Sequence, residues 1–221
     1  MDTNKISESQ LNDALCEVRK AHRLIYEYQR RMLDLTWFIK TKLDFPQYAG
    51  IKKYSNPISS RGTIFHDMWS WDFIYTYVFE YYLGEQADID RKLSWKFCII
   101  QVSDTGFYKG CQDEVTATNI NSYASPEDSE TRLLFYLSIS PNSSEEYDWD
   151  PSNIINSYAG RAEAGQDEFY KIENPNRIGS VQIIYSVPLS RFLDEENTVM
   201  VLRKFVEYCN TNSNTKLHIN E

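Results

Sequence analysis

Residues 7–44 read SESQLNDALCEVRKAHRLIYEYQRRMLDLTWFIKTKLD. Apolar side chains recur three or four residues apart along this stretch, which is typical of one face of an amphipathic helix. The members of this row are Leu11, Ala14, Val18, Ala21, Ile25, Tyr28, Met32, Leu35 and Ile39. Ser7 and Gln10 fit a capping box, and Pro46 cannot continue a helix. The stretch therefore predicts one long helix that begins at Ser7 and ends before Pro46.

The predicted helix is long for a chain of this size. At about 1.5 Å per residue it measures roughly 55 Å, whereas a compact domain of this size is about 45 Å across. The helix could project, pair with its copy in a second chain, or kink and lie across its own sheet. A two-stranded coiled coil is disfavoured because Ala14, Ala21 and Tyr28 occupy positions where branched aliphatic residues are expected. A homodimer through a second apolar row stays open, with the interface residues Leu15, Leu24, Leu33 and Trp37.

The composition indicates an acidic globular protein. With 221 residues, 42% of them hydrophobic and 25% charged, we expect the long helix in residues 1–45 and one α+β domain in residues 46–221. The net charge of −9 argues against broad nucleic-acid binding and against binding to anionic membranes. The first ten residues lack the apolar core of a signal peptide, and no run of about eighteen apolar residues occurs.

The four cysteines, Cys16, Cys98, Cys111 and Cys209, are scattered and form no CxxC pair. Isolated cysteines at apolar positions are typical of buried thiols in a reducing compartment. We therefore expect a cytoplasmic protein.

A dense aromatic run precedes the first clear turn of the predicted domain. In residues 69–83 the apolar side chains fall on one parity, which predicts a strand, although a helix would place Asp72, Thr76 and Glu80 on one polar stripe. The aromatic content and Gly84, which is expected to close the element, favour the strand. Residues 93–100 alternate in the same way and predict the second strand of a hairpin.

The rest of the chain predicts further strands and one helix. Residues 47–62 and 109–130 are expected as loops and residues 141–177 as an irregular region, whereas residues 132–140 and 181–189 are expected as strands. Asp194 is a good N-cap for a last helix, whose buried stripe would be Val199, Leu202, Val206 and Cys209. The polar tail after it is expected to be frayed. The fold class is thus α+β, with a long N-terminal amphipathic helix and a C-terminal helix packed on an antiparallel sheet of about four or five strands.

Three sets of residues are candidates for chemistry. Asp104-Thr105-Gly106 follows an apolar strand, as the catalytic carboxylate of a homodimeric aspartic protease would, but it also fits a strand-ending turn. A metal-dependent hydrolase would draw on His66, Asp67, Asp72 and Asp104. In that case Asp72 and Asp104 should lie at one edge of the hairpin, with a cation or Arg61 between them.

The third set is aromatic and could stack on a planar ligand such as a nucleobase, although such a row is more often simply core. Its members are Trp69, Trp71, Tyr75, Tyr77 and Trp95. With Phe79 and Phe97 added, this set suggests a pocket of a small-ligand or nucleotide sensor between the sheet and the loop 109–130. No phosphate-binding glycine loop, nucleophile elbow or zinc-finger spacing is present in the sequence.

The leading hypothesis is a non-enzymatic, cytoplasmic interaction or regulatory protein. It would act through the long helix and the acidic surface, by self-association or by docking to a protein partner, for example as an inhibitor or immunity-type protein. The ligand sensor and the metal-dependent hydrolase are the alternatives. We expect no cofactor, no dedicated metal site and no membrane partner.

Overall fold

A computed structural model describes residues 6–47, 49–53, 78–106, 120–141, 166–173 and 179–221. The chain divides into two compact units, Met1–Trp37 and Phe38–Glu221. The fold class is α+β, as the sequence predicts, with a long N-terminal helix, a C-terminal helix and an antiparallel sheet.

The long helix α1 spans Glu8–Lys42, which confirms the prediction from the apolar row. Its start is fixed by the predicted capping box, in which the backbone N–H of Ser7 donates to Gln10 Oε1 (2.9 Å) and the N–H of Gln10 donates to Ser7 Oγ (3.2 Å). The two bonds satisfy backbone donors that the first turn of a helix leaves without partners.

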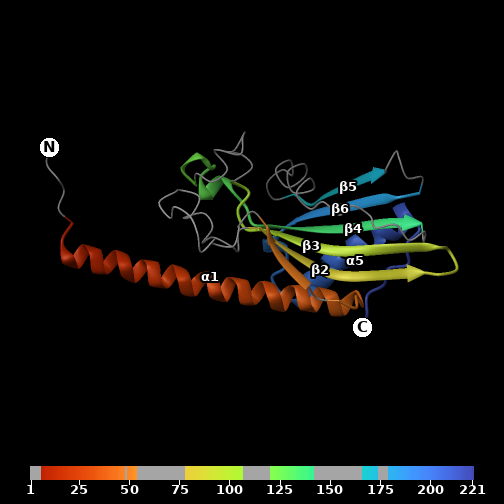
Figure 1. Ribbon diagram of the computed structural model, residues 1–221, viewed down its shortest axis with the longest axis horizontal. Coiled ribbons are helices and arrows are strands. Elements are labelled where there is room, and N and C mark those ends of the chain that lie inside the picture. Colours follow the sequence, from red (N-terminus) through yellow and green to blue (C-terminus); the bar gives the residue numbers. More distant parts are fainter. Residues whose placement is uncertain (1–5, 48, 54–77, 107–119, 142–165, 174–178) are drawn as a thin grey trace, which may run out of the picture. The chain divides into compact units, whose positions relative to one another are not determined.

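The sheet has six strands in the described part of the chain, one more than the upper number expected, and the order is β1-β2-β3-β4-β6-β5 (Figure 1). All neighbours are antiparallel. The strands are β1 (Ala49–Lys53), β2 (Val78–Asp88), β3 (Leu93–Val102), β4 (Arg132–Pro141), β5 (Glu168–Glu173) and β6 (Val181–Pro188). Strand β1 lies in a predicted loop and β5 in a predicted irregular region, so both of those predictions are wrong.

The β2–β3 hairpin confirms the predicted pair of strands and corrects its bounds. Residues 78–83 are strand, so the helix alternative is wrong for them, whereas residues 69–77 lie outside the described residues. Gly84 does not close the strand. It sits at a bulge next to Tyr82 with φ of 108°, a backbone conformation that favours glycine, and the strand continues to Asp88.

Helix α5 (Glu195–Ser213) lies against one face of the sheet (Figure 1). As predicted, Asp194 caps it, with its side chain accepting from the N–H of Asn197 (2.8 Å). Phe205 is fully buried and its ring packs 5.4 Å from Phe97 and 5.3 Å from Phe135, measured between centroids. The buried stripe differs in part from the predicted one, because the side chains of α5 that are buried are Thr198, Val201, Leu202, Phe205 and Cys209.

The C-terminal tail is packed and not frayed, which corrects the prediction. Leu217 is 4% exposed, and its N–H and C=O both bond to the side chain of Asn210. The N–H of Asn220 donates to the C=O of Lys42 (2.8 Å), so the tail ties α5 to the end of α1. The described residues also form three 3-10 turns, Ile120–Ser122, Pro126–Asp128 and Leu189–Arg191. Among the described helices, none is long and apolar enough to cross a membrane.

Candidate functional site

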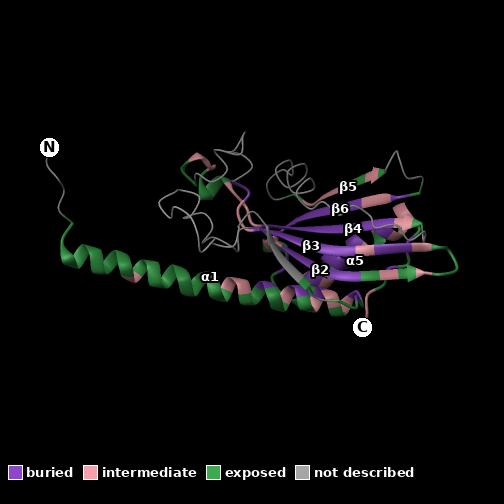
Figure 2. Cartoon of the chain, viewed as in Figure 1, coloured by how far each residue is buried: buried purple, intermediate pink, exposed green. Residues whose placement is uncertain are grey.

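The N-terminal part of α1 exposes an apolar row. We call Leu11, Ala14, Val18, Ala21 and Ile25 the exposed seam. Leu11 is 53% exposed, Val18 50% and Ile25 45%, and both alanines are also exposed. Figure 2 shows this part of α1 as exposed over almost its whole length. The same row continues to Met32 and Ile39, which are buried. One periodic pattern therefore contains both solvent-exposed and buried residues.

The second apolar row does not form one continuous surface. Leu15, Leu33 and Trp37 are exposed and lie toward one side of α1, but Leu24 is nine residues from both Leu15 and Leu33. Nine residues are about two and a half turns, so Leu24 projects from the opposite side of the helix. The four residues therefore fit one helical partner less well than the exposed seam does.

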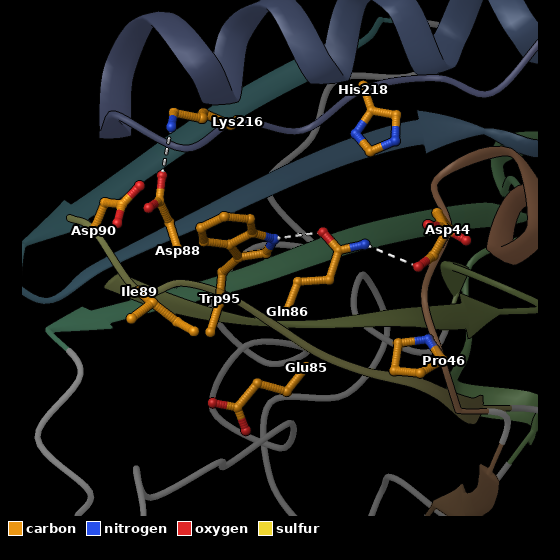
Figure 3. A pocket seen from close by; sticks show the side chains of 11 residues that line it. Asp44, Pro46, Glu85, Gln86, Asp88, Ile89, Asp90, Trp95, Lys216 and His218 are labelled. Atoms are coloured by element: carbon orange, nitrogen blue, oxygen red, sulfur yellow. Dashed lines mark hydrogen bonds and ion pairs between the residues drawn. The ribbon is translucent and has the colours of Figure 1, made fainter. Parts of the chain in front are cut away.

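A hollow of about 660 Å³ lies at the closed end of the β2–β3 hairpin (Figure 3). Its charged lining side chains are Asp44, Glu85, Asp88, Asp90 and Lys216, and Trp95 and His218 are also part of the lining. The acidic residues outnumber the lysine, so this lining favours cationic groups over anionic ones.

The polar groups at the centre of this hollow are bound to each other. Lys216 Nζ lies 2.8 Å from Asp88 Oδ2 and, together with the backbone N–H of Arg91, lowers the pKa of the Asp88 carboxyl. Trp95 Nε1 donates to Gln86 Oε1 (2.9 Å), and Gln86 Nε2 donates to the C=O of Asp44 (2.9 Å). These bonds hold the hairpin to the end of α1 and to the tail. No group of three metal-ligating side chains occurs in the part of the chain that the structure describes.

Asp104 is engaged in a turn. Its Oδ1 accepts from the N–H of Gly106 (2.7 Å), while the N–H of Thr105 donates to the C=O of Glu130 (2.9 Å) and the N–H of Glu130 donates to Thr105 Oγ1 (2.9 Å). This is the strand-ending turn that the sequence offered as the alternative to a catalytic aspartate. The turn is locked to the segment that leads into β4.

Most of the other candidate residues from the sequence lie outside the part of the chain that the structure describes. His66, Asp67, Asp72 and Arg61 lie outside the described residues, as do Trp69, Trp71, Tyr75 and Tyr77. The loop 109–130, which was to close the sensor pocket, is described only from residue 120 on. Trp95 is 4% exposed, so its indole belongs mainly to the core and offers little free surface for stacking.

One buried polar cluster was not found from the sequence. Arg132 is 1% exposed and donates from Nε to Ser186 Oγ (2.9 Å), from Nη1 to Glu130 Oε2 (2.6 Å) and from Nη2 to the C=O of Gln166 (2.6 Å). A charged residue at the start of an apolar strand, with Glu130 two positions before it, was the available signal. Because Nε, Nη1 and Nη2 each donate to a protein acceptor, we read the arginine as a structural link between β4, β6 and the segment before β5.

Comparison with known proteins places the chain in a family. Over 43 residues, or 20% of this chain, it is 46% identical to a protein of Pasteurella multocida (strain Pm70) named Uncharacterized protein PM0109, and the match covers 21% of that relative's length. No solved structure matches the chain. Residues 8–214, which include α1, α5 and the six described strands, match the PM0109 family. The chain therefore belongs to the PM0109 family.

Proposed function

We propose that this chain is a non-enzymatic interaction protein that binds a helical protein segment through the exposed seam of α1. The observation that supports the proposal is the exposure of the seam, where Leu11, Val18 and Ile25 each keep about half of their surface in water. Transfer of apolar surface out of water is worth about 25 cal/mol per Å². Covering the seam is therefore favourable, and a heptad row matches the stripe that another helix presents.

The helix itself also favours a partner. In proteins, most helical stability comes from packing of an apolar face and not from intrinsic propensity. The part of α1 from Glu8 to Glu27 has no buried side chain. A partner helix on the seam would supply the missing packing.

The proposal includes a cytoplasmic location. Cys98 and Cys209 are buried free thiols, which persist in a reducing compartment.

Site-specific photo-cross-linking in cells that produce the protein tests the proposal. A photoreactive residue at Val18 samples the seam, and the same residue at Lys20 is the matched control, because it lies about 200° further around α1 and its side chain is 67% exposed. We expect a covalent adduct with a protein from Val18 and none from Lys20. No adduct from Val18, or equal adducts from both positions, would contradict the proposal.

A further inference from the structure

We propose that the occupant of the exposed seam is a second copy of this chain, in which the two α1 helices run antiparallel with Val18 of each copy facing Ala21 of the other. This inference rests on the proposed function and adds the identity of the partner and the direction of pairing. Three features of α1 carry it: the sizes of the seam residues, the distribution of charge along the helix and the length of the row that is exposed.

The seam alternates large and small side chains. Leu11, Val18 and Ile25 occupy one heptad position, and Ala14 and Ala21 occupy the other. A parallel dimer in register would place alanine opposite alanine and leave gaps in every second layer. An antiparallel dimer places the heptad position of the large residues in one helix opposite the heptad position of the alanines in the other. Every large residue then faces an alanine or Tyr28.

The antiparallel layers follow from one register. With Val18 facing Ala21, the remaining layers are Ala14 facing Ile25 and Leu11 facing Tyr28, and each layer occurs twice by symmetry. In the four central layers a large side chain then packs against an alanine, and the two outer layers, Leu11 facing Tyr28, are larger. The alanines that disfavour an ordinary parallel coiled coil are the residues that suit this arrangement.

Charge is segregated along α1. The described charged residues up to position 17 are all acidic, namely Glu8, Asp13 and Glu17, whereas Arg19, Lys20, Arg23, Arg30 and Arg31 follow with Glu27 as the single acid among them. An antiparallel pair places the acidic segment of each copy beside the basic segment of the other. A parallel pair aligns acidic with acidic and basic with basic segments. Because only Glu8, Glu17 and Arg31 among these residues flank the seam, the difference acts at longer range and not through direct ion pairs.

The exposed part of the apolar row on α1 has the length that the register with Val18 facing Ala21 requires. The seam is exposed as far as Ile25, Tyr28 is half-buried, and Met32 is 1% exposed and unavailable to a partner. The proposed layers use residues 11–28 and stop before Met32. A membrane surface fits less well, because the acidic residues near the N-terminal end of the seam would face anionic lipid.

The expected dimer is weak and reversible. Eighteen residues of helix measure about 27 Å, and a contact of this length between two helices falls below the roughly 1,200 Å² of stable interfaces. We therefore expect dissociation constants in the micromolar range or weaker, and exchange of subunits on mixing.

Cysteine cross-linking of the full chain tests the direction and the register. In a background with Cys16→Ser and Cys111→Ser, one chain carries Ala14→Cys and a second chain, made longer by a tag, carries Ile25→Cys. A short bis-maleimide should join the two chains when they are mixed. Each chain alone should stay unlinked, because two copies of the same position lie about 16 Å apart along the antiparallel pair. Circular dichroism checks that both variants are folded, which is expected since the two side chains are exposed.

The other outcomes are decisive as well. Linking of each chain with itself and not with the other would establish a parallel pair and overturn the inference. No linking in any mixture, with a monomer in sedimentation at near-millimolar concentration, would also overturn it. In that case the proposed function is judged separately by the mass of the Val18 photo-adduct, which would contain one copy of this chain and a different protein.

Discussion

Replacement of Arg132 by methionine should destabilise the domain strongly, because it removes the donor of a buried network. Glu130, Ser186 and Gln166 would each lose a hydrogen bond from the guanidinium. Removal of one partner from a buried ion pair costs about 3–5 kcal/mol. Glu130 keeps 25% of its side-chain surface in water, so hydration screens its charge and the lower end, about 3 kcal/mol, is expected.

The matched control is Lys171→Met on the edge strand β5. Lys171 pairs with Glu173 at 3.0 Å, but the two side chains are 32% and 74% exposed, so its loss should cost below about 1 kcal/mol. Urea unfolding followed by circular dichroism gives both free energies of unfolding, provided that the slope with urea is unchanged. A cost for Arg132→Met equal to that of the control would refute the assignment of Arg132 as a structural link.

Three further predictions concern the core, the turn and the effect of pH. Phe205→Ala should lower the free energy of unfolding by about 3–5 kcal/mol, whereas Met200→Ala, at a position of α5 that is 51% exposed, should change it by less than about 0.5 kcal/mol, both measured by urea unfolding. Gly106→Ala should cost about 1–3 kcal/mol in the same assay, because the new Cβ would lie 2.6 Å from Ser129 Oγ; a neutral effect would mean that the turn adapts freely. Burial raises the pKa of the Cys209 thiol far above its ordinary 9.0, so the unfolded chain releases this proton first, and stability is full below about pH 9 and falls as the pH rises further. Denaturation at several pH values should show that Cys209→Ala reduces this decline by about 1.4 kcal/mol per pH unit. An unchanged dependence of the free energy of unfolding on pH would contradict the raised pKa of Cys209.

The helices were predictable because their signals are local. The apolar row and the capping box of α1, and the Asp194 cap of α5, are readable within a few residues of sequence. The two strands that were missed, β1 and β5, are the two edges of the described sheet. Edge strands are short and tolerate charged residues, as in the sequence EFYKIE of β5, so their alternation is weak.

Contacts between distant parts of the chain could not be read in this way. The polar tail looked frayed because its composition is polar, yet Asn210 and Lys42 provide bonding partners for its backbone. The pairing of Lys216 with Asp88 likewise depends on where the tail runs. Periodicity alone also could not separate the exposed part of the α1 row from the buried part, since both follow one heptad pattern.

Sedimentation equilibrium of the full chain tests the central claim, that α1 binds a second copy through its exposed seam. The wild-type chain should pass from a 26.0 kDa monomer to a dimer as its concentration rises through the micromolar range. Val18→Lys, which places a charge at the centre of the seam, should remain at the monomer mass, while Lys20→Val should still dimerise. A wild-type chain that stays at 26.0 kDa at every concentration, or a Val18→Lys chain that dimerises equally well, would contradict the account.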